Sequence, residues 1–355
     1  MNLEDLGYSE ELENYRKDQG LISLGVARVI SEHRERYVVK TAEDEYEAEV
    51  IGNLRFSAQK RSDFPAVGDW VAISEYDEKK VLIHAVFPRR GSIERRSAGK
   101  QDEIQIIATN IDFALIVQAV DRDFNINRLQ RYLTICNTAG VEPIVLLNKI
   151  DLVNDEDISD LISRVQERVK HVPVIAFSNE TGKGYDALIS QIAKSKTYCL
   201  LGSSGVGKST LINNLSGKSR MKTGTISSST SKGRHITSHR ELIVLENGGI
   251  LIDNPGMREV GMTDSESGIG ITFDDISALA ENCKFTDCTH TGELGCAVLE
   301  ALENGKIDEN SYENYLKIER EKEHFESKVA ERRKKEKAFG KIIKNYKKYR
   351  NKNNL

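Results

Sequence analysis

The stretch TYCLLGSSGVGKSTLINNL, residues 197–215, decides the fold of this chain. It passes from an apolar segment through a glycine-rich turn into residues with helical spacing, which predicts a strand, a loop and a helix. The turn fits G-x-x-x-x-G-K-[ST] completely, a pattern typical of loops whose backbone N–H groups surround phosphate oxygens. The residues expected to bind a nucleotide here are Gly202, Ser203, Ser204, Gly205, Val206, Gly207, Lys208, Ser209 and Thr210.

Two side chains of this loop carry chemistry of their own. Lys208 places a cation against the β- and γ-phosphates, so we expect it to serve catalysis as well as binding. The Ser209 hydroxyl is expected to bind Mg²⁺. The helix that follows adds the positive end of its dipole.

Outward from the loop, strand and helix patterns alternate along the chain. Continuous apolar runs, typical of buried parallel strands, lie at 113–120, 144–147 and 172–177. Helical patterns separate them at 129–136, 157–170 and 183–194, and two more strands are expected at 242–245 and 248–253. This alternation predicts an α/β fold with a doubly wound, largely parallel sheet.

The segment Asn148-Lys149-Ile150-Asp151 indicates which base is bound. It ends the strand at 144–147, at the carboxyl edge where α/β folds bind ligands. A carboxylate such as Asp151 can accept from N1–H and the exocyclic amino group of guanine, whereas adenine would leave it unpaired. With Asn148 and Lys149 beside it, the segment predicts GTP and GDP as ligands. It argues against an ATP-using enzyme such as a small-molecule kinase.

A second acidic segment, Asp253-Asn254-Pro255-Gly256, follows the last expected strand. Asp253 can hold Mg²⁺ through water, and Gly256 can offer its N–H to the γ-phosphate. Thr237 lies between the loop and Asp253. It is the candidate for a second hydroxyl on Mg²⁺, ordered when the γ-phosphate is present. An ordinary polar loop residue is the alternative for Thr237.

Three of the five cysteines fall within fourteen residues. Cys283, Cys288, His290 and Cys296 form C-x₄-C-x-H-x₅-C, a closed Cys₃His set, and we expect them to hold one structural Zn²⁺. Free cysteines in a helical domain, or a redox pair, are the alternatives. The other two, Cys136 and Cys199, fall at apolar positions and are expected in the core.

Length and composition bound the remaining chain. The 355 residues allow two or three domains, and a hydrophobic fraction of 39% excludes wholesale disorder. No apolar run reaches the roughly 18–20 residues that span a bilayer, and the acidic, polar start does not have the pattern of a signal peptide. We therefore expect a cytoplasmic protein without a membrane partner. Its first 20 residues are expected to be a loosely held polar leader.

The net charge of −4 hides a basic end. Residues 328–355 hold twelve Lys or Arg and two Glu, which suggests a polyanionic partner for this tail. A second basic cluster either neutralises phosphates or is a solvated linker; its members are Arg89, Arg90, Arg95, Arg96 and Lys100.

Between residues 21 and 87, five short strand patterns predict a small β-barrel. An OB-fold is one such barrel, and OB-folds often bind oligonucleotides. A small β-domain used only for packing is the alternative.

The order of the motifs is that of a circular permutation. In Ras-like GTPases the phosphate loop precedes the N-K-x-D segment, whereas here 148–151 precedes 202–209, which precedes 253–256. A barrel, a permuted GTPase and a Cys/His cluster in this order resemble the bacterial ribosome small subunit-dependent GTPase A family (RsgA, also called YjeQ or YloQ). The resemblance covers roughly residues 20–310. Its most specific segments are GSSGVGKSTLIN, GRHITSHREL, DNPGMRE and CKFTDCTHTGELGC.

The resemblance implies an N-terminal OB-fold, a circularly permuted P-loop GTPase domain and a mainly helical, zinc-binding C-terminal domain. The expected divisions are 1–20, 21–100 with the basic linker, 101–268, 269–327 and the tail 328–355. It implies a GTP hydrolase that acts in late maturation of the small ribosomal subunit, binds that subunit and its rRNA, and is stimulated by it. Other assembly factors are further candidate partners, and we expect a monomer.

The resemblance also implies roles for single residues. Ser178 and Asn179 match guanine-contacting positions, although Ser178-Asn179-Glu180 departs from the family's usual Ser-Ala-Lys-like turn. His235 matches a histidine proposed to position water; a purely local loop role is the alternative. Met257 takes the place of the glutamine that orients water in Ras, which fits slow intrinsic turnover. Two functions stay open: a checkpoint GTPase, and a GTP-gated rRNA-binding assembly protein whose hydrolysis is incidental.

Overall fold

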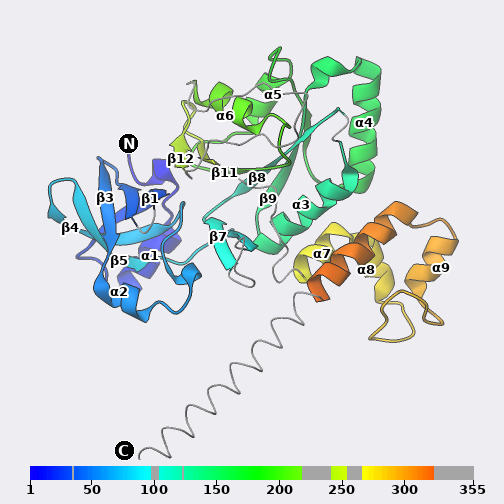
Figure 1. The fold of residues 1–355 in the computed structure, drawn as a ribbon, viewed down its shortest axis with the longest axis horizontal. Coiled ribbons are helices and arrows are strands. Elements are labelled where there is room, and N and C mark those ends of the chain that lie inside the picture. Colours follow the sequence, from blue (N-terminus) through cyan, green and yellow to red (C-terminus); the bar gives the residue numbers. More distant parts are fainter. Residues whose placement is uncertain (34–35, 97–103, 122–123, 218–240, 254–265, 324–355) are drawn as a thin grey trace, which may run out of the picture. The chain divides into compact units, whose positions relative to one another are not determined.

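The computed structural model describes residues 1–33, 36–96, 104–121, 124–217, 241–253 and 266–323 (Figure 1). The chain divides into two compact units, residues 1–261 and 262–355. The first unit holds the barrel and the α/β sheet, and the second holds the Cys/His cluster. Within the described residues, no helix is long and apolar enough to cross a membrane.

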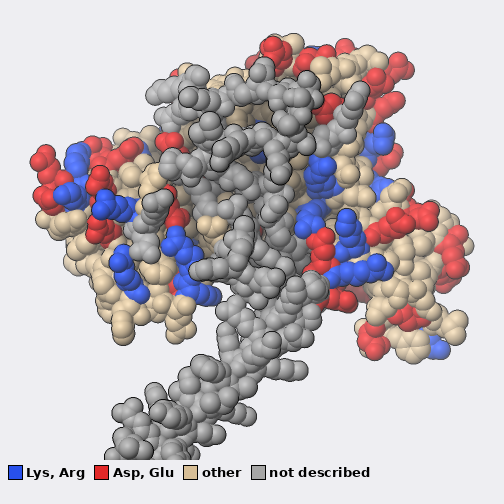
Figure 2. All heavy atoms as spheres, viewed as in Figure 1, with Lys and Arg blue, Asp and Glu red and all other residues tan. Residues whose placement is uncertain are grey.

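The five strands expected at the N-terminal side are present and form a closed barrel. They are β1 (Gly25–His33), β2 (Arg36–Lys40), β3 (Glu45–Val50), β4 (Trp70–Asp77) and β5 (Lys80–Val86). Their order is β1-β2-β3-β5-β4, and β4 pairs back with β1. The β3–β5 pair is parallel and the others are antiparallel. This OB-like arrangement carries a short helix, α2 (Gly52–Ser57), between β3 and β4, and Lys and Arg side chains lie near that helix in Figure 2.

The first 20 residues are held against the barrel, so the expectation of a loosely held leader was wrong. The short helices η1 (Glu4–Leu6) and α1 (Glu10–Asp18) form there. Leu6 is fully buried, and the ring of Tyr8 meets Trp70 edge-on at 4.9 Å. A few apolar side chains anchor the segment although its composition is polar. Composition averaged over 20 residues conceals such anchors.

The predicted doubly wound α/β sheet is confirmed. Its strands run in the order β10-β9-β8-β11-β13-β12, parallel except for β12. The bounds are β8 (Phe113–Ala119), β9 (Glu142–Asn148), β10 (Val174–Ala176), β11 (Thr197–Leu201), β12 (Glu241–Val244) and β13 (Ile250–Asp253). Glu241 of β12 also registers with Ser31 of β1, which continues the sheet into the barrel. A separate hairpin pairs β6 (Ile93–Arg96) with β7 (Ile104–Ala108).

Helices cover both faces of this sheet because its strands are apolar on both sides. On one face, α3 (Ile126–Ala139) and α4 (Asp155–Arg168) bury Leu129 and Val165 against Ile116. On the other, α5 (Tyr185–Ser190) and α6 (Lys208–Ser216) bury Leu188 and Leu211 against Leu115. Neighbouring residues of β8 thus serve opposite cores, as alternation in a strand requires.

The helix expected at 183–194 is shorter, since α5 covers only Tyr185–Ser190. The backbone N–H of Gln191 already bonds to Leu188, and that of Ile192 to Ile189, so the last turn tightens. Ser195 then adopts φ +63°, and the chain reverses into β11. The apolar spacing continues past Ser190 because Ile192 still packs in the core.

The second unit is helical, as predicted, and is interrupted by the Cys/His cluster. Its elements are α7 (Glu266–Thr272), α8 (Asp274–Ala280), α9 (Ala297–Glu303) and a helical stretch over 309–323. They enclose a core of their own, formed by Ile269, Phe273, Ile276, Val298, Ala301 and Ile318. Helical structure is already present at Glu266, the first described residue of this unit, before position 269 where the C-terminal domain is expected to begin.

Candidate functional site

The loop between β11 and α6 has the backbone geometry that its glycines allow. Gly202 has φ +143° and Gly207 has φ +100°, backbone angles that residues with a side chain rarely adopt. A Cβ atom on Gly202 would lie 2.3 Å from the carbonyl oxygen of Val117. A Cβ atom on Gly207 would lie 2.2 Å from Nδ2 of Asn148. The second glycine is therefore needed where the N-K-x-D segment approaches the loop.

Basic side chains gather on this loop. Nζ of Lys208 donates to the carbonyl oxygens of Gly202, at 2.8 Å, and Ser203, at 2.5 Å. From the first turn of α3, Nη1 of Arg128 donates to Oγ of Ser203 at 3.0 Å. The sequence analysis missed Arg128 because no local motif marks an arginine that reaches a loop 75 residues away.

Asn148 fastens three segments together. Its Nδ2 donates to the carbonyl oxygen of Val206 at 2.7 Å, and its Oδ1 accepts from the backbone N–H of Asn179 at 3.2 Å. Nδ2 of Asn179 in turn donates to the carbonyl oxygen of Gly207 at 2.9 Å. Asn148 is buried, so its amide is committed to this junction. The phosphate loop, the 148–151 segment and the 178–180 turn are thus brought to one place.

The carboxylate expected to contact the base is held from the same turn. Oγ of Ser178 donates to Oδ1 of Asp151 at 2.5 Å and accepts from the backbone N–H groups of Glu180 and Thr181 at 3.2 Å. Lys149 has φ +68° and forms an ion pair with Asp121 at 2.7 Å. The resulting turn orients Asp151 without using its second oxygen in the Ser178 bond.

Two further side chains, those of Tyr185 and Asn214, hold the 178–180 turn through Asn179. The hydroxyl of Tyr185 donates to Oδ1 of Asn179 at 2.6 Å, and Nδ2 of Asn214 donates to the Tyr185 hydroxyl at 2.9 Å. Asn214 also donates to the carbonyl oxygen of Asn179 at 3.2 Å. Sequence reasoning gave no signal for either residue, because both lie on helices whose patterns indicate only packing.

Asp253 ends β13 and is buried. Burial and, to a smaller extent, the nearby Glu241 raise the pKa of its carboxyl group, and Lys208 lowers it, so that the resulting pKa is about 6. Ser209 lies in the first turn of α6. The other predicted residues near the γ-phosphate, His235, Thr237, Gly256 and Met257, lie outside the described residues.

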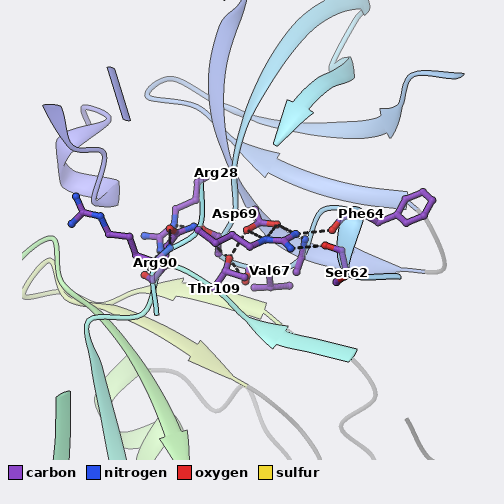
Figure 3. A network of polar contacts seen from close by, with 11 residues as sticks. Arg28, Ser62, Phe64, Val67, Asp69, Arg90 and Thr109 are labelled. Carbon is purple, nitrogen blue, oxygen red and sulfur yellow. Dashed lines mark hydrogen bonds and ion pairs between the residues drawn. The ribbon is translucent and has the colours of Figure 1, made fainter. Parts of the chain in front are cut away.

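The barrel meets the nucleotide-binding sheet through a buried polar network (Figure 3). The Asp69 carboxylate accepts from Oγ1 of Thr109 at 2.6 Å and from Nη2 of Arg89 at 2.7 Å. The guanidinium of Arg28, also buried, donates to Oγ1 of Thr197 at 3.0 Å and to the carbonyl oxygens of Leu6, Gly68 and Asn110. Since Thr197 begins β11, the network reaches the strand that leads into the phosphate loop.

This network corrects one expectation about the basic cluster at 89–100. Arg89 donates to the carbonyl oxygens of Ser62 and Phe64 as well as to Asp69, so its guanidinium is engaged inside the protein. Arg90 is exposed and pairs with Glu11. Nothing is described of the side chains of Arg95 and Arg96, and Lys100 lies outside the described residues.

The Cys/His cluster is gathered in the second unit. The ligand atoms of Cys283, Cys288, His290 and Cys296 all lie within 4.8 Å of one another. Sγ of Cys283 lies 3.8 Å from Sγ of Cys296, and Nδ1 of His290 lies 3.6 and 3.5 Å from these two sulfurs. A tetrahedral zinc ion with Zn–S bonds of about 2.3 Å requires S–S edges of roughly 3.8 Å. The four residues therefore fit a structural zinc site.

Comparison with known proteins identifies the chain. Residues 86–263 match the family described as RsgA GTPase. The protein is 41% identical to the small ribosomal subunit biogenesis GTPase RsgA of Opitutus terrae over 85% of both chains. It is 37% identical to RsgA 1 of Bacteroides thetaiotaomicron over 98% of this chain and 97% of that one. The chain belongs to the RsgA GTPase family.

Solved structures related to the RsgA family share the fold. The crystal structure of YjeQ from Thermotoga maritima aligns with a TM-score of 0.63 at 24% identity, over 84% of this chain and 98% of that chain. YloQ, described as a circularly permuted GTPase, aligns with a TM-score of 0.61 at 26% identity, over 85% and 96%. The permuted order predicted from the motifs is therefore confirmed.

Membership of the RsgA family makes the protein a GTP hydrolase. A GTPase implies Mg²⁺ with the nucleotide, and the chain offers the Ser209 hydroxyl and the Asp253 carboxylate for it. When bound, Mg²⁺ neutralises charge on the β- and γ-phosphates. The Cys₃His cluster leaves no ligand position open, so zinc there serves structure rather than hydrolysis.

Proposed function

We propose that this protein binds the small ribosomal subunit and hydrolyses GTP to GDP and phosphate as a checkpoint or release step in late subunit maturation. Relatives named small ribosomal subunit biogenesis GTPases, similar over 85–98% of this chain, support the proposal. The observation that carries the GTP-dependent part is the fastening of Asp151 and the phosphate loop to one turn, through Ser178 and Asn148. A cytoplasmic monomer is proposed with it.

Within this function, the nucleotide-binding residues take separate roles. We assign the base contact to Asp151 and Asn179, and the phosphates to the N–H groups of residues 202–210 and the ammonium of Lys208. Ser178, Asn148 and Lys149 hold these groups in place. Gly256 is assigned to the γ-phosphate, and Thr237 to Mg²⁺ together with Ser209 and Asp253.

Hydrolysis requires a water in line with the γ-phosphorus, and we assign its orientation to His235. Imidazole is a credible water-positioning group near neutral pH. Met257 has no group that could orient water. Slow hydrolysis by the protein alone, accelerated by the small subunit, follows from this assignment.

The flanking segments are proposed to hold the subunit. We divide the chain into an N-terminal segment held against the barrel (1–20), an rRNA-binding barrel with its linker (21–100), the GTPase domain (101–268), the zinc domain (269–327) and a basic tail (328–355). The charge of the tail suits rRNA phosphates. Other assembly factors are proposed as further partners of these flanking segments.

Measuring GTP hydrolysis by the purified protein alone, with small subunits and with large subunits tests the proposal. We expect a slow basal rate and stimulation by small subunits only. Guanine-nucleotide binding without stimulation would contradict the checkpoint role. It would favour a GTP-gated rRNA-binding assembly protein with incidental hydrolysis, the second candidate, which the apolar Met257 favours.

A further inference from the structure

An aromatic side chain stands out from the barrel on α2. Phe56 is 92% exposed, more than any other large hydrophobic residue in the described part of the chain; Leu294 follows at 87%. Leu54 of the same helix packs against the barrel core, so α2 is anchored while Phe56 faces solvent. An exposed phenyl ring leaves apolar surface in water, and covering it with an apolar partner would be favourable.

The surroundings of Phe56 are polar and basic. Residues 50–62 contain three Lys or Arg and no Asp or Glu. Arg55 and Lys60 are exposed, as are the polar neighbours Asn53, Ser57 and Gln59. Arg61 pairs with Glu32, and its guanidinium lies 5.9 Å from the centre of the Phe64 ring.

Other surfaces of the same barrel have the opposite charge. Residues 43–49 hold five Asp or Glu, and residues 75–78 hold three. Figure 2 shows Lys and Arg side chains in the part of the barrel where Figure 1 places α2. Some of these carboxylates are paired, since Lys40, Lys79 and Lys80 bind Glu45, Asp44 and Asp77. The α2 surface is still the more favourable of these surfaces for a polyanion.

We propose that α2 is a stacking site for single-stranded RNA, in which the ring of Phe56 lies against a base and Arg55 and Lys60 face the flanking phosphates. Only an unstacked base offers its face to an aromatic side chain, so the occupant is a single strand rather than a duplex. A protein-docking site would place further apolar residues around the ring, whereas the neighbours here are polar. The identification of this strand as rRNA rests on the proposed function.

Binding of a fluorescein-labelled single-stranded oligoribonucleotide of about 12 nucleotides, within the range that such barrels cover, tests the site. At low salt, Phe56→Ala should weaken binding roughly 5- to 100-fold, and Phe56→Tyr should retain it. Tyr76→Ala is the matched control. Tyr76 is an aromatic residue of the same barrel, 52% exposed, but it lies between Glu75 and Asp77. Tyr76→Ala should therefore leave binding of the oligoribonucleotide unchanged.

A second variant reports contact directly. Phe56→Trp places an indole at the site, and a base stacked on it should quench its fluorescence, whereas Tyr76→Trp should not respond. The chain's one tryptophan, Trp70, is buried and supplies a constant background. Equal RNA affinity of wild type and Phe56→Ala, or equal loss in Phe56→Ala and Tyr76→Ala, would overturn the proposal. Quenching by RNA-free ribosomal proteins but not by RNA would indicate a protein partner instead and would overturn it too.

The same variants separate this inference from the proposed function. If the wild-type protein is not stimulated by small subunits, the proposed function fails, whatever the oligonucleotide result. If small subunits stimulate wild type and Phe56→Ala equally, and the two proteins bind the oligonucleotide equally, only the α2 site fails. Thermal unfolding of each variant shows that the fold is intact, which is expected for a side chain that packs against nothing.

Discussion

At the level of single residues, we expect guanine binding to depend on how the Asp151 carboxylate is held by the Ser178 hydroxyl. Ser178 is buried and bonds to Asp151, which lies 27 residues earlier in the chain. A carboxylate without a partner reorients in its site, whereas one held by a hydroxyl is preorganised for the base. The affinity for guanine nucleotides should therefore depend on this side chain.

Ser178→Ala should raise the Kd for GDP on the order of 10- to 100-fold, because hydrogen bonds to charged groups contribute about 1.5–3 kcal/mol. Isothermal titration calorimetry measures this change. Thr181→Ala is the control, since Thr181 lies in the same turn, is exposed and accepts only a backbone N–H from Lys183. Unchanged GDP affinity in Ser178→Ala would show that Asp151 needs no such support.

Asp253 carries a destabilising charge in the nucleotide-free protein. Its pKa is about 6 when folded, against 3.8 for an ordinary aspartate, so the folded state binds the proton more tightly than the unfolded state. Protonation therefore stabilises the fold. The stabilisation is complete below about pH 4, and it is lost as the pH rises through about 6.

Asp253→Asn removes this charge. In magnesium-free buffer at pH 7.5, the variant should be more stable than wild type by on the order of 2 kcal/mol, and the gain should shrink as the pH falls from 6 towards 4. Urea unfolding at pH 7.5 and at pH 4.5 measures this difference in the free energy of unfolding. Glu241→Gln should give a smaller gain, because Glu241 only adds to the effect of burial. A gain that is equal at pH 7.5 and pH 4.5 would contradict this origin.

At the scale of the element, the zinc domain is made by the short loops between α8 and α9. His290 adopts φ +59°, and its carbonyl oxygen accepts from the hydroxyl of Tyr312 at 2.6 Å. The carboxylate of Glu293 accepts from the hydroxyl and N–H of Thr289, which lowers its pKa. Cys283, Cys288 and Cys296 pack in or against the helical core of this unit, so a metal bound by them would tie the loops to that core.

Cys288→Ala should lose the bound zinc and should reduce hydrogen-exchange protection across residues 266–323. GDP affinity should stay within about twofold, because the nucleotide site lies in the other compact unit. Zinc content by atomic absorption and exchange by mass spectrometry test this. The reciprocal control is Cys136→Ala, which should keep the zinc and destabilise the first unit, where Cys136 is fully buried. Full zinc content in Cys288→Ala would rule out the Cys₃His site.

Across the first unit, the barrel and the GTPase sheet are joined by a buried network of polar side chains centred on Arg28 and Asp69. Burial lowers the pKa of Arg28 to about 10, so its guanidinium remains charged at neutral pH. Its charge is balanced by Asp69 and Asp112 and satisfied by the carbonyl groups around it. Such a group is costly to break, because every partner is left unpaired and buried.

Arg28→Met should lower the free energy of unfolding of the first unit by about 3 kcal/mol, since several buried carbonyl groups lose their donor. Arg28→Lys should not restore this stability. A lysine ammonium is compact and cannot reach all the acceptors that surround the planar Arg28 guanidinium. Urea denaturation measures both. Lys80→Met, which removes an exposed pair with Asp77, should change stability by less than about 0.5 kcal/mol. A loss below 1 kcal/mol in Arg28→Met would mean that the junction is held by other contacts.

Features that depend on local backbone chemistry could be predicted from the amino-acid sequence. The glycines at 202 and 207, the apolar run before them and the N-K-x-D segment predicted the phosphate loop, the α/β sheet and the permuted order, because each pattern acts over a few neighbouring residues. The spacing of Cys283, Cys288, His290 and Cys296 likewise predicted one cluster, since Cys and His side chains so close in sequence can reach one tetrahedral ion.

Only the tertiary structure decided what depends on distance across the fold. Arg89 looked available for phosphates, yet it is engaged with Asp69. Leu6 looked loosely held, yet it is fully buried. Arg128 and Ser178 meet partners 75 and 27 residues away. The physical reason is that a charged or apolar side chain acquires its role from the groups that folding packs around it, and those groups are not its neighbours in sequence.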